Sequence, residues 1–586
     1  MGVIRRTISS SRSTRKGLFV SVLVLGLVAG ACSSDKTATV SGTTVANGTA
    51  TTAASSGSTT ASGSTTASGS TDATGTTTAT AATAASTTPA KQVDLHWGLS
   101  VSPDTLYAPT YFSTPIGSGL MGLVQDNLLK YTGDGQLLPS AASAWKATSP
   151  TTYVYTLRSD LKFSNGTAVT ADDVKFSIDL QSDATNASKE SALFTNVDNV
   201  AVSGQDIIVT LKTPDTLWKF LPSHMGTYIY SKADVTADRA SYGTPQHVPL
   251  GSGPYMVTEF VADSHVTMVP NPYYWGDKPR FSSIRFDVIP DDQTRLLAMQ
   301  KGDIDGTFDV PSAAIANWQK AATVNSAPSY VFRGLTIDLT QKPLDDIHVR
   351  RALYYATDRT GIAEGLFPGQ GKPSSTLNDS SLFSGILPDA DVQAGYAAID
   401  IFDFSIDKAK AEMAQSSVPG GFAITINVPD GSKAAGLITQ AIKQSWSQIG
   451  VNVTLNVMPG GPRFQVILDH APNLGIQIIG NVPDVPDPMQ LLALYYDSAA
   501  ATKGGNNSSN FKDPAVDALI AKARQSSDPK EAATLALQIQ QDAAKQIPII
   551  PILWTDLKFA VRKDWKSGPM NGFSVSNNFV EILTPA

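Results

Sequence analysis

The chain has 586 residues, 42% of them hydrophobic, which is enough for two or three domains with sizeable cores. Its formal net charge of −7 argues against a nucleic-acid partner. A single cysteine excludes an intrachain disulfide and a cysteine-based metal cluster.

The N-terminal segment is first basic, then apolar, then composed of small residues. Basic residues between Arg5 and Lys16 precede an apolar run at 18–28 that is too short for a comfortable membrane span. The small residues 29–31 then lead to Cys32, the single thiol. This order resembles a bacterial lipoprotein signal, so we predict that residues 1–31 are removed and that Cys32 carries a lipid anchor on the extracytoplasmic face of the cell membrane. The alternative is a plain secretory signal with an incidental cysteine.

Residues 32–91 have the composition of a linker. Ser, Thr, Ala and Gly dominate, aromatic residues are absent, and the unit STTASG occurs at 58–63 and again at 64–69. Such a segment buries too little apolar area to offset its ordering entropy, so we expect a disordered tether. A flexible chain of this length spans roughly 40–45 Å.

From Gln92 onward the pattern indicates an α/β fold. Residues 93–97 and 153–157 alternate as strands do, and Asn165-Gly166 is a turn signal. A capping box at 170–173 predicts a helix start.

The carboxyl half alternates helices with strands. An apolar stripe at 437–449, closed by Gly450, predicts a helix, and 451–457 predicts a strand. Asp513-Pro514 and Asp528-Pro529 each predict an N-cap followed by proline at the first helical position. These alternations argue against a helical bundle and against an all-β sandwich.

Residues 481–488 read NVPDVPDP and lie between an apolar run at 474–479 and an apolar helical pattern at 489–495. Three prolines in eight residues forbid a regular helix and a central strand. We therefore predict a stiff turn that carries two carboxylates, Asp484 and Asp487.

Five segments in register carry a family resemblance: LRSDLKFSNGTAVTADDVKFSIDL (157–180), GSGPYMVTEF (251–260), NPYYWGDKP (271–279), IRFDVIPDDQTRLLAMQKGDID (284–305) and PLDDIHVRRALYYATDR (343–359). They resemble successive blocks of the oligopeptide-binding family, the solute-binding proteins of the peptide/nickel class of ABC importers.

The resemblance implies a two-lobed α/β periplasmic-binding-protein fold with a hinge and an extra subdomain in the first lobe. It places lobe I at 92–335 with the subdomain at about 136–246, lobe II at 336–548, and a return to lobe I at 549–586. Residues 336–339 and 549–553 are the expected crossovers between the lobes.

The same resemblance implies a ligand site at the 481–488 turn. In relatives the turn resembles W-x-A-D-Y-x-D-P, and its first aspartate pairs with the α-amino group of a peptide. By this match Asp484 takes the amine-binding position, while Asp487 is expected to cap the following helix. Both aspartates could instead be simple turn residues. Asn481 and Val485 replace the two aromatic residues of the pattern, which favours a more polar peptide or a non-peptide solute.

Two further regions are also predicted to contact a ligand. Ser102, Pro103, Asp104 and Thr105 match a first-lobe loop that meets ligand in relatives, although an ordinary βα turn has the same pattern. Trp554 could stack on a ligand or pack in the core near the hinge.

The predicted function is capture of a small solute, an oligopeptide or dipeptide by preference, and its delivery to ABC permease subunits with separate ATPase subunits. We expect a monomer that is not an enzyme and has no cofactor or metal; among six scattered histidines, His470 is the one to test. Three alternatives stay open: a non-peptide solute such as a nickel chelate, an amine or a sugar-like molecule; a tethered receptor or adhesin without transport; and a glycoside hydrolase that uses Asp484 and Asp487.

Overall fold

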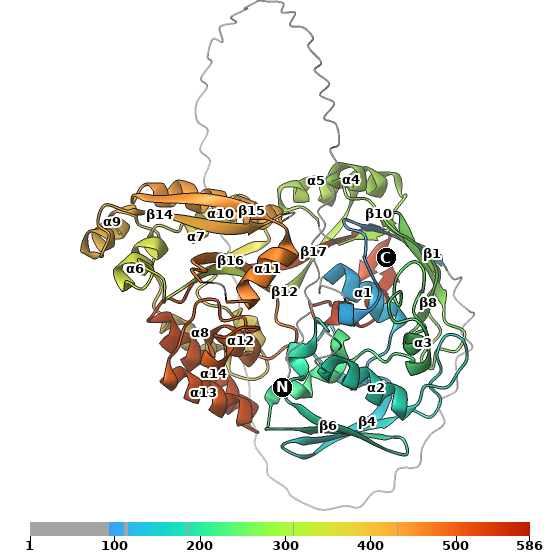
Figure 1. Cartoon of the computed structure of the whole chain (residues 1–586). Helices are drawn as coiled ribbons and strands as arrows, with labels where there is room; N and C mark the ends of the chain where they lie inside the picture. Colours follow the sequence, from blue (N-terminus) through green and yellow to red (C-terminus); the bar gives the residue numbers. More distant parts are fainter. Residues whose placement is uncertain are drawn as a thin grey trace, which may run out of the picture. The chain divides into compact units, whose positions relative to one another are not determined.

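The computed structural model describes residues 93–110, 115–183, 186, 188–308, 310–430, 432–470 and 472–586. The predicted signal segment, Cys32 and the tether lie outside these residues, so their assignments stay predictions. Within the described ranges the fold is mixed α/β, as predicted (Figure 1).

One sheet of eleven described strands connects the two lobes. Its order is β15-β14-β16-β12-β17-β11-β1-β10-β9-β8, and the short β13 (Gly371–Pro373) joins β17. The strands β12 (Ala322–Ile337) and β17 (Ile549–Arg562) lie at the centre and pair antiparallel with each other. We call this pair the crossover ribbon, and we use lobe I for residues 93–321 and 563–586 and lobe II for residues 338–548.

The lobe I part of the sheet is built from β1 (Val93–Leu99), β8 (Tyr255–Val261), β9 (His265–Pro270), β10 (Phe281–Val288) and β11 (Gly306–Thr307). Apolar residues on alternate positions of β1 enter its core, where the Trp97 ring lies 5.0 Å from Phe308 and 5.1 Å from Phe579. The helices α1 (Pro115–Val124), α4 (Asp292–Lys301) and α5 (Ile315–Ala321) also belong to this lobe. The chain's last segment therefore completes the lobe I core.

A smaller sheet forms a distinct layer of lobe I, with the order β4 (Ala142–Ser149), β5 (Thr152–Leu157), β7 (Asp206–Leu211) and β6 (Val197–Ser203). Helix α2 (Ala171–Ser182) contacts this sheet, and the predicted capping box between Thr170 and Asp173 is present at its start. The hairpin β2 (Leu129–Tyr131) and β3 (Leu137–Pro139) completes this region, whereas the helix α3 (Lys232–Ala237) contributes Val235 to the core of the main sheet. The core of the smaller sheet is separate from that of the main sheet.

In lobe II the strand β14 (Phe422–Pro429) pairs parallel with both β15 (Val451–Met458) and β16 (Ile476–Asn481). The predicted helix is α10 (Lys433–Ser447), and Gly450 after it has a φ of +80°, which glycine adopts at low cost. The other helices near this sheet are α6 (Ile347–Tyr355), α7 (Arg359–Leu366), α9 (Ile406–Gln415) and α11 (Gly460–Leu468).

A helical layer forms the rest of lobe II, and α12, α13 and α14 contact one another (Figure 1). Its helices are α8 (Asp389–Ala397), α12 (Met489–Tyr496), α13 (Pro514–Gln525) and α14 (Pro529–Ala544). Asp513 and Asp528 cap α13 and α14, each followed by proline at the first helical position, as predicted. A short antiparallel pair of β18 (Trp565–Ser567) and β19 (Leu583–Pro585) closes the C-terminal segment.

Candidate functional site

The 481–488 turn links β16 to α12 and is held by the side chain of Gln490. Gln490 Oε1 accepts from the backbone N–H of Asp484 at 2.5 Å, and its Nε2 donates to Asp484 Oδ2. Asp487 Oδ1 accepts from the N–H of Met489, the first residue of α12, at 2.7 Å. Asp487 thus accepts a hydrogen bond at the start of α12, although it lies one residue before the N-cap residue Pro488.

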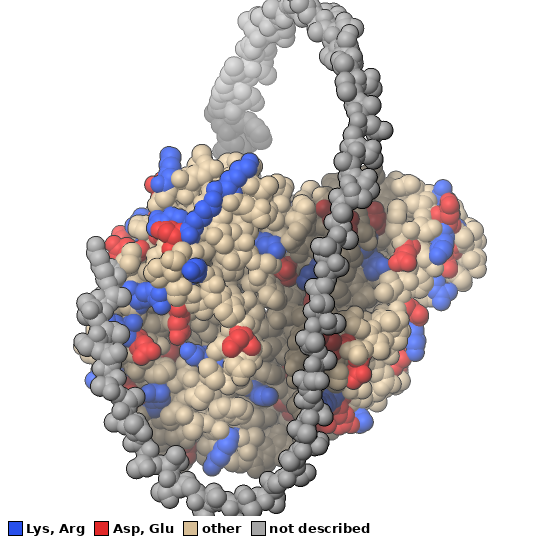
Figure 2. All heavy atoms as spheres, turned by 180° about the vertical axis from the view of Figure 1, so that it is seen from behind, with Lys and Arg blue, Asp and Glu red and all other residues tan. Residues whose placement is uncertain are grey.

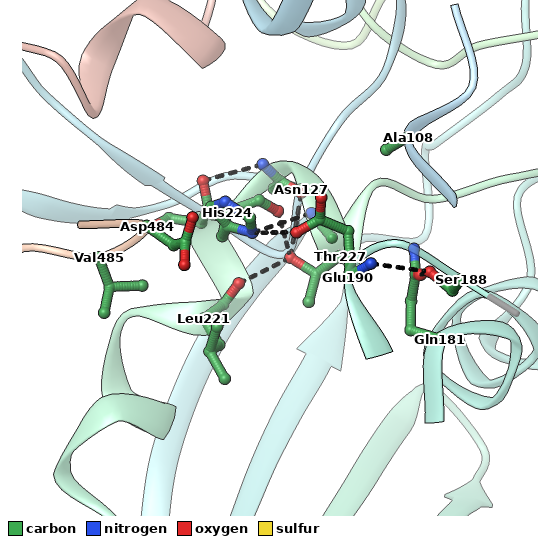
Figure 3. A network of polar contacts seen from close by, with 12 residues as sticks. Ala108, Asn127, Gln181, Ser188, Glu190, Leu221, His224, Thr227, Asp484 and Val485 are labelled. Atoms are coloured by element: carbon green, nitrogen blue, oxygen red, sulfur yellow. Dashed lines mark hydrogen bonds and ion pairs between the residues drawn. The ribbon is translucent and has the colours of Figure 1, made fainter. Parts of the chain in front are cut away.

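Asp484 faces two titratable residues of lobe I. His224 lies between Asp484 and Glu190 (Figure 3), and its Nδ1 is 3.8 Å from Glu190 Oε2. The same Nδ1 accepts from the N–H of Gly226 at 3.1 Å, so it carries no proton in this arrangement. The short Glu190–His224 contact is therefore not a charged pair.

Burial dominates the electrostatics of this cluster. It raises the pKa of Glu190 to about 8, and the nearby Asp484 carboxylate adds to the effect. Burial also raises the pKa of Asp484 and lowers the pKa of His224. All three groups are thus driven toward their neutral forms, and a cation entering between the two carboxyls would restore their charge.

Lobe I holds its side of the cluster rigidly. Asn127 Nδ2 donates to the carbonyl of Ser223 at 3.0 Å, and Thr227 Oγ1 donates to Asn127 Oδ1 at 3.1 Å. The N–H of Glu190 donates to Ser188 Oγ at 3.1 Å (Figure 3). These bonds fix the 3₁₀ turns that carry Glu190 and His224.

Val485 and Asn481, which replace the aromatic residues of the family pattern, lie in different surroundings. Val485 is 1% exposed and packs in the core of the smaller lobe I sheet, so it joins the lobes through an apolar contact. Asn481 Nδ2 donates to the hydroxyl of Tyr495 at 3.1 Å. Ligand contact by either residue stays a prediction.

The predicted first-lobe loop is anchored to its own lobe. Ser102 Oγ accepts from the N–H of Asp263 at 3.0 Å, and Thr105 Oγ1 donates to the carbonyl of Gly243 at 3.3 Å. Pro103 is buried and Asp104 is exposed. The contacts described for these residues do not bring the loop to the 481–488 turn, and its role in ligand binding stays a prediction.

Trp554 lies on β17. Its Nε1 donates to the carbonyl of Leu377 at 3.1 Å, and its ring is 6.4 Å from that of Tyr396. These contacts favour the core alternative for Trp554, while stacking on a ligand stays a prediction.

A cavity of about 490 Å³ lies between the lobes and is lined in part by residues 486–488 of the turn. Trp145, Tyr153 and Phe220 line it from lobe I, and residues 486–489 and the ends of α13 and α14 line it from lobe II. At its wall Arg524 of α13 donates to Asp215 Oδ2 at 2.6 Å, across the lobes. A second interlobe ion pair joins Lys433 of α10 to Asp292 of α4 at 3.2 Å.

Sequence reasoning missed Glu190, His224, Asp215 and Arg524, as well as the cavity's aromatic residues. None of them lies in a motif, and the site forms only when distant segments meet.

Neither a metal centre nor a membrane span is found among the described residues. No group of three or more His, Cys, Asp or Glu side chains there could hold a metal ion. His470 Nε2 instead donates to the carbonyl of Gly505 at 3.1 Å. In the same part of the chain, no helix combines the length and hydropathy needed to cross a bilayer.

Comparisons with known proteins identify the family. Residues 136–503 match the bacterial extracellular solute-binding proteins, family 5. Protein XP55 of Streptomyces lividans is 28% identical over 460 residues, which cover 76% of this chain and 80% of that protein. A glutathione-binding protein of Shigella dysenteriae serotype 1 is 25% identical over 420 residues, 70% of this chain and 79% of that protein.

Solved structures show the same fold. The periplasmic binding protein DppA from Helicobacter pylori, in complex with the peptide STSA, superposes with a TM-score of 0.72 at 20% identity, over 84% of this chain and 98% of that one. The match to residues 136–503 spans well over half of the sequence, so the chain belongs to the family 5 bacterial extracellular solute-binding proteins. It is thus a two-lobed solute-binding protein of the ABC importer class, which confirms the predicted family and fold.

Proposed function

We propose that this protein captures a small solute with a cationic group, a short peptide by preference, between lobes I and II and delivers it to a membrane permease. The cavity of about 490 Å³, lined by both lobes, carries this proposal. A ligand that touches both walls stabilises the closed arrangement, and the closed form is then the signal for docking.

The cationic preference comes from Asp484 and Glu190. Two buried carboxyl groups face one cluster in which the described residues supply no lysine or arginine partner. An ammonium group placed there would form charge-assisted hydrogen bonds worth about 1.5–3 kcal/mol. The amine-binding role of Asp484 in the family pattern agrees with this electrostatic argument.

The replacement of two aromatic residues in the turn bears on the solute's identity. Asn481 and Val485 remove two aromatic walls, while Trp145, Tyr153 and Phe220 offer others on the opposite lobe. A relative named for glutathione binding and a structural neighbour solved in complex with the peptide STSA support a peptide-like solute.

The location belongs to the same proposal. Lipidation of Cys32 and a tether over 32–91 would hold the binding lobes outside the cell membrane, beside the permease and its ATPase subunits. In the view of Figure 2, basic and acidic side chains are interspersed over the surface, which suits a freely tumbling monomer on such a tether.

A ligand screen tests the proposal. Purified protein without residues 1–31 is mixed with short peptides, amines and metal chelates, and thermal unfolding and small-angle X-ray scattering are recorded. Saturable stabilisation with a smaller radius of gyration supports capture. If no solute binds and the scattering never changes, the proposal fails. Turnover of a glycoside substrate in a separate product assay would replace it with an enzyme.

A further inference from the structure

A small pocket of about 140 Å³ lies in lobe II, at the carboxyl ends of the parallel strands β14 and β16. Pro429 and Ser432 line it from the β14–α10 connection, and Gly480 lines it from the end of β16. In α/β sheets, ligands bind in the crevice outside the carboxyl ends of the strands. The position alone therefore marks this pocket as a place to look for a ligand group.

Two arginines line the pocket, and no acidic residue does. Arg333 comes from β12 of the crossover ribbon, opposite Gly480 in the strand register, and Arg463 comes from α11. Among the described residues, neither guanidinium forms an ion pair with a carboxylate. Two cations thus share a small pocket without a counter-charge.

The two arginines differ in how the protein satisfies them. Arg463 is 8% exposed, its Nε donates to the carbonyl of Asn427 at 3.0 Å, and its Nη2 donates to the carbonyl of Ile478. The Nε of Arg333 is shielded from solvent and has no hydrogen-bond partner. A buried polar group without a partner costs about 1–3 kcal/mol, and more when it is charged.

Burial also acts on the charges themselves. It lowers the pKa of Arg333 and brings the pKa of Arg463 to about 10. Both groups stay cationic at neutral pH, because an arginine gives up its proton only far above it. An anion bound in this pocket would therefore balance the two positive charges.

We propose that Arg333 and Arg463 form a subsite for an anionic group, a carboxylate or phosphate, of the captured solute. This inference rests on the proposed capture of a solute between the lobes, and it names the chemistry of a second end of that solute. The planar guanidinium matches both anions with paired N–H donors.

The geometry fits one anionic group and not a whole solute. The pocket has less than a third of the volume of the interlobe cavity. Tyr495 connects it to the turn, since its hydroxyl accepts from Asn481 and it interacts electrostatically with both Arg463 and Asp484. A solute with its cationic group at Asp484 can thus direct an anionic group toward the arginines.

Gly480 is part of the same arrangement. A Cβ atom at this position would lie 2.9 Å from Arg333 Nη1. The missing side chain therefore leaves room for the guanidinium, and Gly480→Ala should displace it without removing its charge.

The test uses the full binding lobes with sodium succinate and sodium phosphate as probes, against sodium chloride at matched ionic strength. Thermal unfolding is measured for the native chain, Arg333→Met, Gly480→Ala and the control Arg285→Gln, which removes a lobe I cation paired with Asp287. Succinate or phosphate should stabilise the native chain and the control, with at least tenfold weaker apparent affinity in Arg333→Met and Gly480→Ala. The stronger probe identifies the group as carboxylate or phosphate.

A second readout separates binding from structure. Because Arg333 has an unpartnered Nε, Arg333→Met should unfold at the same or a higher temperature than the native chain when no anion is present. A lower unfolding temperature for Arg333→Met, or an undiminished anion response, overturns the inference. In that case the proposed capture of a solute still stands if the solute screen finds a ligand. The opposite result is an anion response that depends on Arg333, while the screen finds no solute and no lobe closure. That result overturns the proposed capture and keeps the anion site.

Discussion

Arg524 and Asp215 form an ion pair of 2.6 Å that joins α13 of lobe II to the smaller sheet region of lobe I. Asp215 is 8% exposed and also accepts from the N–H of Leu217, so its position is fixed before Arg524 reaches it. The pair stands at the wall of the interlobe cavity. It therefore contributes to lobe closure more than to the folding of either lobe.

Replacing Arg524 should favour the open arrangement of the lobes. Arg524→Gln removes a partly exposed ion pair worth about 1 kcal/mol, roughly a fivefold change in the open-to-closed ratio. The radius of gyration without ligand should rise, and solute affinity should fall by a similar factor. Lys522→Gln is the matched control, because Lys522 pairs with Glu531 inside lobe II. Equal scattering from both variants would show that the pair does not act on closure.

Asp484→Asn tests the amine site directly. The substitution keeps the shape of the side chain and removes its charge, so any amine solute found in the screen should bind at least tenfold more weakly in calorimetry. Asp469→Asn, which alters an exposed carboxylate at the end of α11, should leave the affinity unchanged. Unchanged affinity in Asp484→Asn would remove the cationic preference from the proposal.

Asp487 should matter for stability. Asp487→Ala removes the acceptor for the N–H of Met489 at the start of α12, so the free energy of unfolding should fall by about 1 kcal/mol. Asp487→Asn retains an acceptor oxygen and should stay close to the native chain. Denaturant unfolding with both variants distinguishes loss of this hydrogen bond from loss of the charge.

Glu190 should make the stability of the unliganded protein depend on pH. Its pKa is 4.5 in an exposed setting and about 8 in the structure, so the folded state binds the proton more tightly. The corresponding stability is fully present below pH 4.5 and is lost as the pH rises through 8. Glu190→Gln, a permanent mimic of the neutral form, should flatten this dependence between pH 5 and 9.

Thermal unfolding across this range gives the readout for Glu190. At pH 9 the variant should melt at least about 2 °C above the native chain, since 1 kcal/mol shifts the midpoint by this order. The exposed Glu581 supplies the control, and Glu581→Gln should leave the pH profile as it is. Parallel profiles for the native chain and Glu190→Gln would contradict the assigned pKa.

Local sequence signals predicted local structure well. The capping box at Thr170, the helix that Gly450 closes, the strand after it, and the caps at Asp513 and Asp528 are all present. Each of these features depends on hydrogen bonds between residues a few positions apart, so the local sequence is enough to predict it. The family and the two-lobed fold were predicted from five segments in register and are confirmed.

The site was predictable only in part. The sequence singled out Asp484 and Asp487, because proline and aspartate in one short turn are conspicuous. It gave no sign that Glu190 and His224 face Asp484, or that Arg524 reaches Asp215 across 309 positions. Likewise Arg333 and Arg463 line one pocket because β12 pairs with β16 and α11 packs nearby. Contacts of this kind depend on the packing of the lobes, which no short window specifies.

The crossover ribbon has a consequence for the speed of solute exchange. Its strands β12 and β17 stay bonded to each other from Ala322 to Thr336, with the register irregular between Ala327 and Val331 and between Arg333 and Gly334. Bending of the ribbon at those irregular points would rotate the lobes relative to each other. The other hydrogen bonds between β12 and β17 would stay intact, so few backbone groups would have to exchange a protein hydrogen bond for one with water. A small energetic barrier of this kind suits a receptor that must load and unload many times in the life of one molecule.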